Sequence, residues 1–142
     1  DEVTVVMETT SRKPEPIAAL FSGEDVRQFH EIVRQVPVAE EIVRYAVRLA
    51  SASRPGQPDS PEFVNRWISW GAGLRAAQCL ILGAKANALL DGRSHASSGD
   101  VRALAHCTFR HRVLVGYRAE AEGVSVDQVV DRLLEHVPTP AG

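Results

Sequence analysis

Hydrophobic residues recur every three or four positions along most of the chain, which is the period of an amphipathic helix. A first helix is expected to begin after Ser22, whose hydroxyl and Asp25 form a pattern typical of a capping box. A second is expected to begin at Glu40 and Glu41, since acidic side chains are favourable near a helix N-terminus. The apolar stripes of the two helices are Val26, Phe29, Ile32 and Val33, and Ile42, Tyr45, Ala46 and Leu49.

The longest predicted helix runs from Leu74 to Leu90 and is apolar on most of its sides. Such a helix is usually the central one of a bundle. Gly92 is expected to end it, because glycine readily adopts the left-handed conformation that closes many helices. The residues expected to face the core are Leu74, Ala77, Leu80, Ile81, Ala84 and Ala88.

Two closing helices are expected after serine caps, at Ser97 or Ser98 and at Ser125. Two segments are ambiguous: residues 63–70 are short, and residues 113–115 could form an extended piece. The pattern as a whole predicts an all-α fold, a small bundle of about five helices. Apolar residues expected to face its core from the closing helices are Val101, Leu104, Ala105, Val126, Val129, Val130, Leu133 and Leu134.

The chain has 142 residues and is 44% hydrophobic, enough for one domain with a real core. Its 16 Lys and Arg against 18 Asp and Glu give a net charge of −2, which argues against a surface built for nucleic acid or anionic lipid. No segment approaches the ~18 apolar residues of a membrane span. We therefore expect no membrane partner and regard nucleic acid as a poor fit.

The potential metal ligands are sparse. Cys79 and Cys107 can form neither a disulfide framework nor a four-thiolate site, and they suit reduced thiols in the cytoplasm. His106 and His111 are five residues apart, a poor spacing for one helical face. We expect a cytoplasmic protein without a metal site in this chain.

Catalytic motifs are also missing. The sequence contains no Gly-x-x-x-x-Gly-Lys-Ser/Thr phosphate loop, no Gly-x-Ser-x-Gly elbow and no His-Glu-x-x-His helix. One candidate binding motif stands out: Gly71 and Gly73 form a sharp turn before a helix whose first turn carries Arg75. Free N–H groups and the positive end of a helix dipole suit an anion, which would also relieve the unfavourable position of the arginine. The alternative is an ordinary turn followed by a solvated or ion-paired arginine.

A basic segment from Val101 to Arg118 contains no carboxylate. It could bind nucleic acid as a recognition helix, or face an acidic subunit or a nucleotide. It could equally be a solvated helix face paired with the acidic Glu120, Glu122 and Asp127. The net charge of −2 weakens the nucleic-acid interpretation. The cationic and histidine residues of the segment are Arg102, His106, Arg110, His111, Arg112 and Arg118.

Several short motifs, in order, resemble the C-terminal lid of MoxR-family AAA+ ATPases over nearly the whole chain. Residues 70–76, Trp-Gly-Ala-Gly-Leu-Arg-Ala, resemble the Gly-Ala-Ser-Pro-Arg-Ala motif called sensor 2. Residues 36–54 resemble the run that leads to a Thr-Arg pair. Gly92-Arg93, Asp100-Val101 and the closing His111-Arg112 resemble the segments that follow.

The resemblance implies that residues 1–142 are a single helical lid. Residues 1–20 would be the connection from an upstream AAA+ core, and residues 21–54 the first two helices. Residues 55–62 would be a loop, and residues 63–142 the sensor 2 helix and the closing helices. Because the chain does not begin with methionine, we expect it to be an excised fragment.

The implied function is to bring Arg75, with Gly71 and Gly73, to ATP and to couple nucleotide state to subunit motion in a chaperone-like machine. Arg54, Arg93 and Arg112 are implied as interface residues. ATP and Mg²⁺ would be cofactors of the full-length protein, with Mg²⁺ bound by the core, and this fragment alone would have no cofactor and no catalysis. Implied partners are the core, neighbouring subunits of a hexameric ring, and von Willebrand factor A-type proteins.

The chain departs from the family pattern at three positions. Gly73 and Leu74 replace the Ser and Pro of sensor 2, and Ser53 replaces the usual Thr. Losing a proline that pre-organises the first helical turn leaves the geometry of Arg75 less constrained. The alternatives to a lid are a stand-alone helical interaction module and a DNA-binding regulator that uses Arg102 to Arg118.

Overall fold

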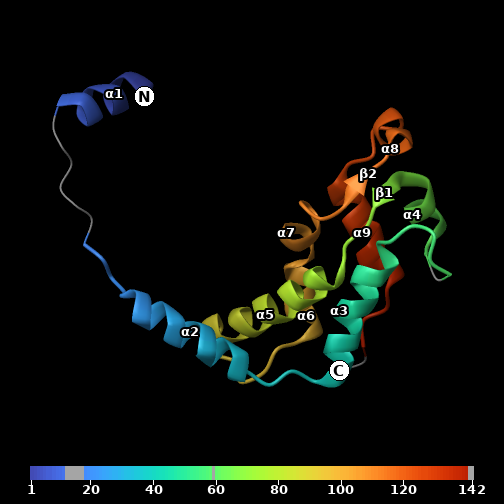
Figure 1. Ribbon diagram of the computed structural model, residues 1–142, viewed down its shortest axis with the longest axis horizontal. Helices are drawn as coiled ribbons and strands as arrows, with labels where there is room; N and C mark the ends of the chain where they lie inside the picture. Colours follow the sequence, from blue (N-terminus) through green and yellow to red (C-terminus); the bar gives the residue numbers. More distant parts are fainter. Residues whose placement is uncertain (12–17, 59, 141–142) are drawn as a thin grey trace. The chain divides into compact units, whose positions relative to one another are not determined.

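The computed structural model describes residues 1–11, 18–58 and 60–140 (Figure 1). It separates into two compact units, Asp1–His30 and Glu31–Gly142. Helix α1 (Glu2–Ser11) buries none of its residues. It lies where the sequence indicated only a connection, over residues 1–20, of which 12–17 are outside the described residues. Helix α2 (Gly23–Gln35) begins as predicted, with the Asp25 amide donating to Ser22 Oγ and the Ser22 amide donating to Asp25.

The prediction of an all-α fold is confirmed, although the described residues form nine helices rather than about five. The helix expected after Ser97 or Ser98 divides at Leu104 into two short ones, and the ambiguous segment 63–70 contributes another. In the second unit the helices are α3 (Glu40–Ala52), α4 (Glu62–Trp67), α5 (Leu74–Leu90), α6 (Ser98–Ala103), α7 (Ala105–Phe109), α8 (Tyr117–Ala121) and α9 (Val126–His136).

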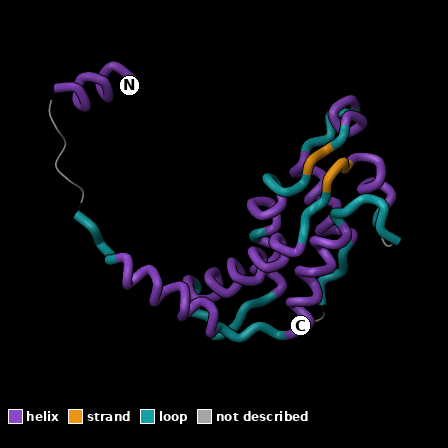
Figure 2. The backbone as a smooth tube through the Cα atoms, in the orientation of Figure 1, coloured by secondary structure: helices purple, strands orange, loops and turns teal. Residues whose placement is uncertain are grey.

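The two ambiguous segments meet in a small antiparallel ribbon, orange in Figure 2. Strand β1 (Ile68–Trp70) pairs with β2 (Leu114–Val115), with Ile68 opposite Val115 and Trp70 opposite Leu114. The Gly116 amide donates to the Trp67 carbonyl at 2.6 Å and extends the pairing. The ribbon, α4 and α8 gather at one end of the second unit (Figure 1).

Helix ends follow the predicted capping chemistry. Ser97 and Ser125 each form a capping box, with Asp100 and Gln128 as the reciprocal partners. Gly92 has a φ of 71°, and the bonds from Arg93 N to Ala88 O (2.8 Å) and from Gly92 N to Leu89 O (3.0 Å) close α5 as a Schellman motif. The motif turns the chain so that Arg93 directly follows the helix.

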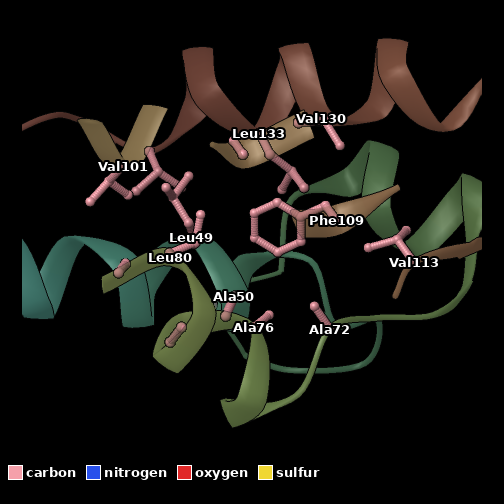
Figure 3. Packing of buried hydrophobic residues seen from close by; sticks show 14 of the residues in the cluster. Leu49, Ala50, Ala72, Ala76, Leu80, Val101, Phe109, Val113, Val130 and Leu133 are labelled. Carbon is pink, nitrogen blue, oxygen red and sulfur yellow. The ribbon is translucent and has the colours of Figure 1, made fainter. Parts of the chain in front are cut away.

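Phe109 lies at the centre of the core. Figure 3 shows its ring between Val130 and Leu133 of α9 on one side and small residues such as Ala50 and Ala76 on the other. Helix α5 packs on α3 through a face of mostly small residues, which lets the two backbones approach closely. The buried residues of α5 are Ala76, Ala77, Leu80, Ala84 and Ala88.

On α5, two residues predicted to face the core do not do so fully. Leu74 is 65% exposed, and Ile81 is only half-buried. At 100° per residue, both lie roughly 70–90° around α5 from the centre of the buried face. The apolar stripe of α2 also stays exposed at Val26, Phe29 and Ile32. No helix in the described part of the chain is both long and apolar enough to cross a bilayer.

Candidate anion-binding site

The turn that precedes α5 is fastened to the end of α3. A Cβ atom on Gly71 would lie 2.3 Å from the Ser53 carbonyl oxygen and 2.5 Å from Arg54 Cα, so only glycine fits there. The next amide, that of Ala72, donates at 2.9 Å to the hydroxyl of Ser53. These two contacts fix the start of α5 against the last turn of α3.

Gly73 has a different role. It is the N-cap residue of α5 in an extended conformation (φ −87°, ψ −176°), and a Cβ atom there would meet nothing within 4 Å. The glycine therefore leaves the first turn of α5 uncovered rather than fitting a tight contact. The first turn carries no acidic side chain that would neutralise the helix end. The Ala76 amide donates to the Gly73 carbonyl at 3.0 Å, and the amides of Leu74 and Arg75 precede the first hydrogen bond of the helix.

Arg75 is the second residue of α5, and its side chain is exposed. It takes part in none of the ion pairs between described residues. A cation in the first turn of a helix is disfavoured by the helix dipole. An exposed guanidinium beside uncovered helix amides is thus arranged to share an anion with them.

A shallow hollow of about 370 Å³ brings this turn together with a distant part of the chain. Within it, Arg112 donates from Nη1 to the Thr108 carbonyl (2.7 Å) and from Nη2 to Cys79 Sγ (3.3 Å). Arg75 and Arg112 therefore line the same hollow, and of the two only Arg112 has side-chain hydrogen bonds to other described residues. Trp70 directly precedes the turn in the sequence, but Leu114 could not be expected there, because the β1–β2 pairing that brings it to Trp70 is nonlocal. The residues lining the hollow are Trp70, Gly71, Gly73, Arg75, Ala76, His111, Arg112 and Leu114.

Arg93 lies outside the hollow in an internal ion pair. Its Nη2 is 2.5 Å from the Asp100 carboxylate, whose side chain is 4% exposed, and 2.9 Å from Asp91. The Arg93 guanidinium holds the pKa of Asp100 well below its usual value, and hydrogen bonds from Ser97 and Asn87 lower it further. The contacts of Arg93 show internal pairing, and its expected place at an interface stays a prediction.

Arg54 lies at the α3 corner outside the lining of the hollow, and its expected interface role also stays a prediction. Its Nε atom is buried and has no hydrogen-bond partner among the described residues. Its carbonyl accepts a hydrogen bond from the Ser60 hydroxyl. The structure thus brings Arg75, Gly71, Gly73 and Arg112 together in the hollow. Arg54 adjoins Gly71 through its backbone but does not line the hollow, and Arg93 lies apart.

The basic segment 101–118 is largely tied to α9. Arg110 pairs with Asp127 at 2.9 Å, as the interpretation of a paired helix face predicted. The ring of His106 lies between Asp127 (3.4 Å) and Asp131 (3.0 Å). Arg102 donates to the Leu134 carbonyl at 2.8 Å. These contacts occupy donors that a nucleic-acid-binding helix would present to phosphates.

No group of three or more His, Cys, Asp or Glu side chains in the described ranges is placed to hold a metal ion. The charged clusters that do occur join carboxylates to arginines or histidine. Glu122, for example, accepts from Arg66 (2.6 Å) and from the Trp67 indole (2.9 Å). The Arg66 and Trp67 hydrogen bonds lower the pKa of Glu122.

Comparison with known proteins gives consistent matches. A family model described as the AAA lid domain matches residues 62–133. Chaperone MoxR1 from Mycobacterium tuberculosis is 30% identical over 127 residues, covering 89% of this chain and 34% of its own. The crystal structure of a predicted ATPase from Cytophaga hutchinsonii superposes with a TM-score of 0.80 at 28% identity, covering 98% of this chain and 43% of that one. The chain thus spans about a third of the length of the first relative and less than half of the second.

Proposed function

The chain belongs to the AAA lid domain family, as a lid of the MoxR type, and we propose that Arg75 is its sensor 2 residue in an ATP-driven machine. The observation that carries this proposal is that Arg75, in the first turn of α5, is exposed and has no ion-pair partner among the described residues. The relatives are described as a chaperone and an ATPase, which supports an AAA+ ATPase as the full-length protein.

The residues of the hollow fit a terminal phosphate. Arg75 would donate to it from a planar fork, and the first amides of α5 would add hydrogen bonds along the helix axis. Gly73 leaves room for the phosphate, since nothing lies within 4 Å of the position its Cβ would occupy. In the transition state of phosphoryl transfer, negative charge is spread over the three equatorial oxygens of the transferring group, where an arginine can stabilise it. Mg²⁺ would be held by the upstream core.

Nucleotide state would be coupled to motion through α5. Its buried face packs on α3 and α6. A force on Arg75 would therefore move these packed helices together rather than the side chain alone. In the full-length protein the lid would lie over the core of its own chain and beside neighbouring subunits of a ring, which we propose to be hexameric. We propose a cytoplasmic, chaperone-like role with von Willebrand factor A-type partners.

Kinetics of the full-length protein test the proposal. Arg75→Ala should lower kcat on the order of 10²-fold and weaken ATP binding much less, because the guanidinium acts on charge that develops in the transition state. Arg75→Lys should recover little, since an ammonium is a point charge without the planar fork. Steady-state hydrolysis and equilibrium nucleotide binding measure the two effects separately.

Arg118→Ala is the matched control. Arg118 is also the second residue of a helix, α8, and also follows a glycine N-cap, Gly116. It lies among Glu62 and Glu122 on another surface, so its loss should leave hydrolysis unchanged. Unchanged hydrolysis in Arg75→Ala would show that Arg75 is an ordinary surface residue and would remove the sensor role from this lid.

A further inference from the structure

The hydroxyl of Ser53 connects two elements that carry the candidate site. Ser53 is fully buried, with 0% of its surface exposed, and it is the C-cap residue of α3. Its hydroxyl donates to the Ala50 carbonyl at 2.8 Å and accepts from the Ala72 amide at 2.9 Å. One oxygen thus satisfies the end of α3 and the turn that begins α5.

Ala72 depends on this contact. It is 1% exposed, so water cannot replace a lost partner of its amide. Within the described residues, this is the one side-chain hydrogen bond to residues 71–73. The neighbouring contact is steric, because Gly71 packs directly on the Ser53 carbonyl and Arg54 Cα. The turn is therefore held at two adjacent residues, Gly71 and Ala72, by contacts with Ser53 and Arg54.

We propose that Ser53 is a positioning residue for Arg75. The proposal rests on the proposed function, because Ser53 acts only through the arginine. Ala72 lies three residues before Arg75, and α5 has neither an N-cap side-chain hydrogen bond nor a proline to fix its first turn. The Ser53 hydroxyl supplies that constraint from outside the helix. Losing it would let the turn shift by a fraction of an ångström and would misdirect the guanidinium.

Full-length protein carrying Ser53→Ala, Ser53→Thr, Arg75→Ala or both alanine changes gives the test. Ser53→Ala should lower kcat about tenfold with a smaller change in KM for ATP, since misplacing a catalytic group is costly even over short distances. Ser53→Thr keeps the hydroxyl and should retain most of the wild-type kcat. Added to Arg75→Ala, Ser53→Ala should cause no further loss, because its effect passes through the missing side chain.

Ser125→Ala is the stability control. Ser125 likewise makes a hydrogen bond to a backbone amide at a helix end, that of Gln128, but it caps α9 away from the hollow. Its removal should destabilise the protein without lowering kcat at a temperature where both variants remain folded. An equal loss of kcat in Ser125→Ala, or the same fold-loss from Ser53→Ala in the Arg75→Ala background, would overturn the proposal.

Amide hydrogen exchange of the full-length protein without nucleotide provides a readout independent of activity. Ser53→Ala should speed exchange in peptides covering residues 69–77 and leave those of α9 unchanged. Unchanged exchange over residues 69–77 overturns the inference whatever the kinetics show. If Arg75→Ala leaves hydrolysis intact, the proposed function fails. If Arg75→Ala is impaired and Ser53→Ala is not, only the role of Ser53 fails.

Discussion

Arg75 and Arg93 lie at opposite ends of α5 in contrasting surroundings. Arg93 follows the helix C-terminus, where a cation is favourable, and it grips the buried Asp100. Arg75 lies at the N-terminus, where a cation is unfavourable, without an ion-pair partner among the described residues. An arginine that improves local stability has a structural explanation. An arginine at a position where it lowers local stability needs a functional explanation instead. This contrast distinguishes Arg75 from Arg93 more clearly than the sequence motif does.

Replacing Asp100 by Asn should cost about 2 kcal/mol of unfolding free energy at pH 7, because hydrogen bonds to a buried charge are lost. The Arg93 guanidinium lowers the folded-state pKa of Asp100, so the ionised carboxylate favours the folded state. This contribution is present above the unfolded carboxyl pKa of about 4 and is lost as the pH falls below it. In urea unfolding, the difference in unfolding free energy between wild type and variant should therefore be largest at pH 7 and smaller at pH 3.

Asp91→Asn provides the comparison, since Asp91 binds the same arginine but its side chain is 56% exposed. Its loss should cost less than about 1 kcal/mol at any pH. A gap for Asp100→Asn that stays constant from pH 7 to pH 3 would contradict the assigned role of its charge.

The candidate site was predictable where the chemistry is local. The sequence alone indicates Arg75 and the two glycines, because a Gly-rich turn before a helix is a continuous pattern. It did not indicate why Gly71 is needed, which is the close approach of Ser53 and Arg54 from another helix. Nor could it place Arg112 in the hollow, since that depends on the contact of α7 with α5, where Arg112 reaches Cys79.

At the scale of the element, the packing of α5 can be tested with two neighbouring leucines. Leu80 has no exposed surface, whereas Leu82 is 39% exposed. Leu80→Asp buries an unpaired carboxylate at a cost of several kcal/mol, a large part of a typical ~5–15 kcal/mol stability. The variant should be unfolded or melt far below wild type when followed by circular dichroism.

Leu82→Asp should melt close to wild type, because its carboxylate can reach water. The half-buried Ile81, which the sequence pattern assigned to the core, should give an intermediate result as Ile81→Asp. If Leu80→Asp and Leu82→Asp melt at the same temperature, the assignment of the buried face of α5 is wrong.

Helix starts were predicted well because capping is local: Ser22, Ser97 and Ser125 each bond within four residues of themselves. The divisions and pairings were not. The break between α6 and α7 at Leu104 is not marked by a glycine or a proline in the sequence. Trp70 and Leu114 pair across the ribbon, yet both are apolar and well exposed. The sequences of β1 and β2 therefore lack the alternation of apolar and polar residues that marks a half-buried strand.

At the scale of the whole molecule, the ends of three elements meet at the candidate site. The C-terminal end of α3, the end of β1 and the start of α5 converge on residues 71–73. The buried core that contains Phe109 includes a residue of each element, Ala50 of α3, Ile68 of β1 and Ala76 of α5. Such a site is built on packed elements rather than on a free loop, which is the arrangement needed for a side chain that must respond to a ligand with defined geometry.

The isolated 142-residue chain should fold into a mainly helical domain and yet fail to hydrolyse ATP. It has no phosphate loop, and its described residues offer no metal-ligand cluster. One exposed arginine and a helix end contribute little binding energy in water, so we expect a Kd for ATP weaker than about 1 mM. Far-UV circular dichroism, a phosphate-release assay and calorimetry measure the three properties. Micromolar ATP binding by this chain would mean that it holds a complete nucleotide site. The description of the chain as a lid that completes the nucleotide site of another domain would then be wrong.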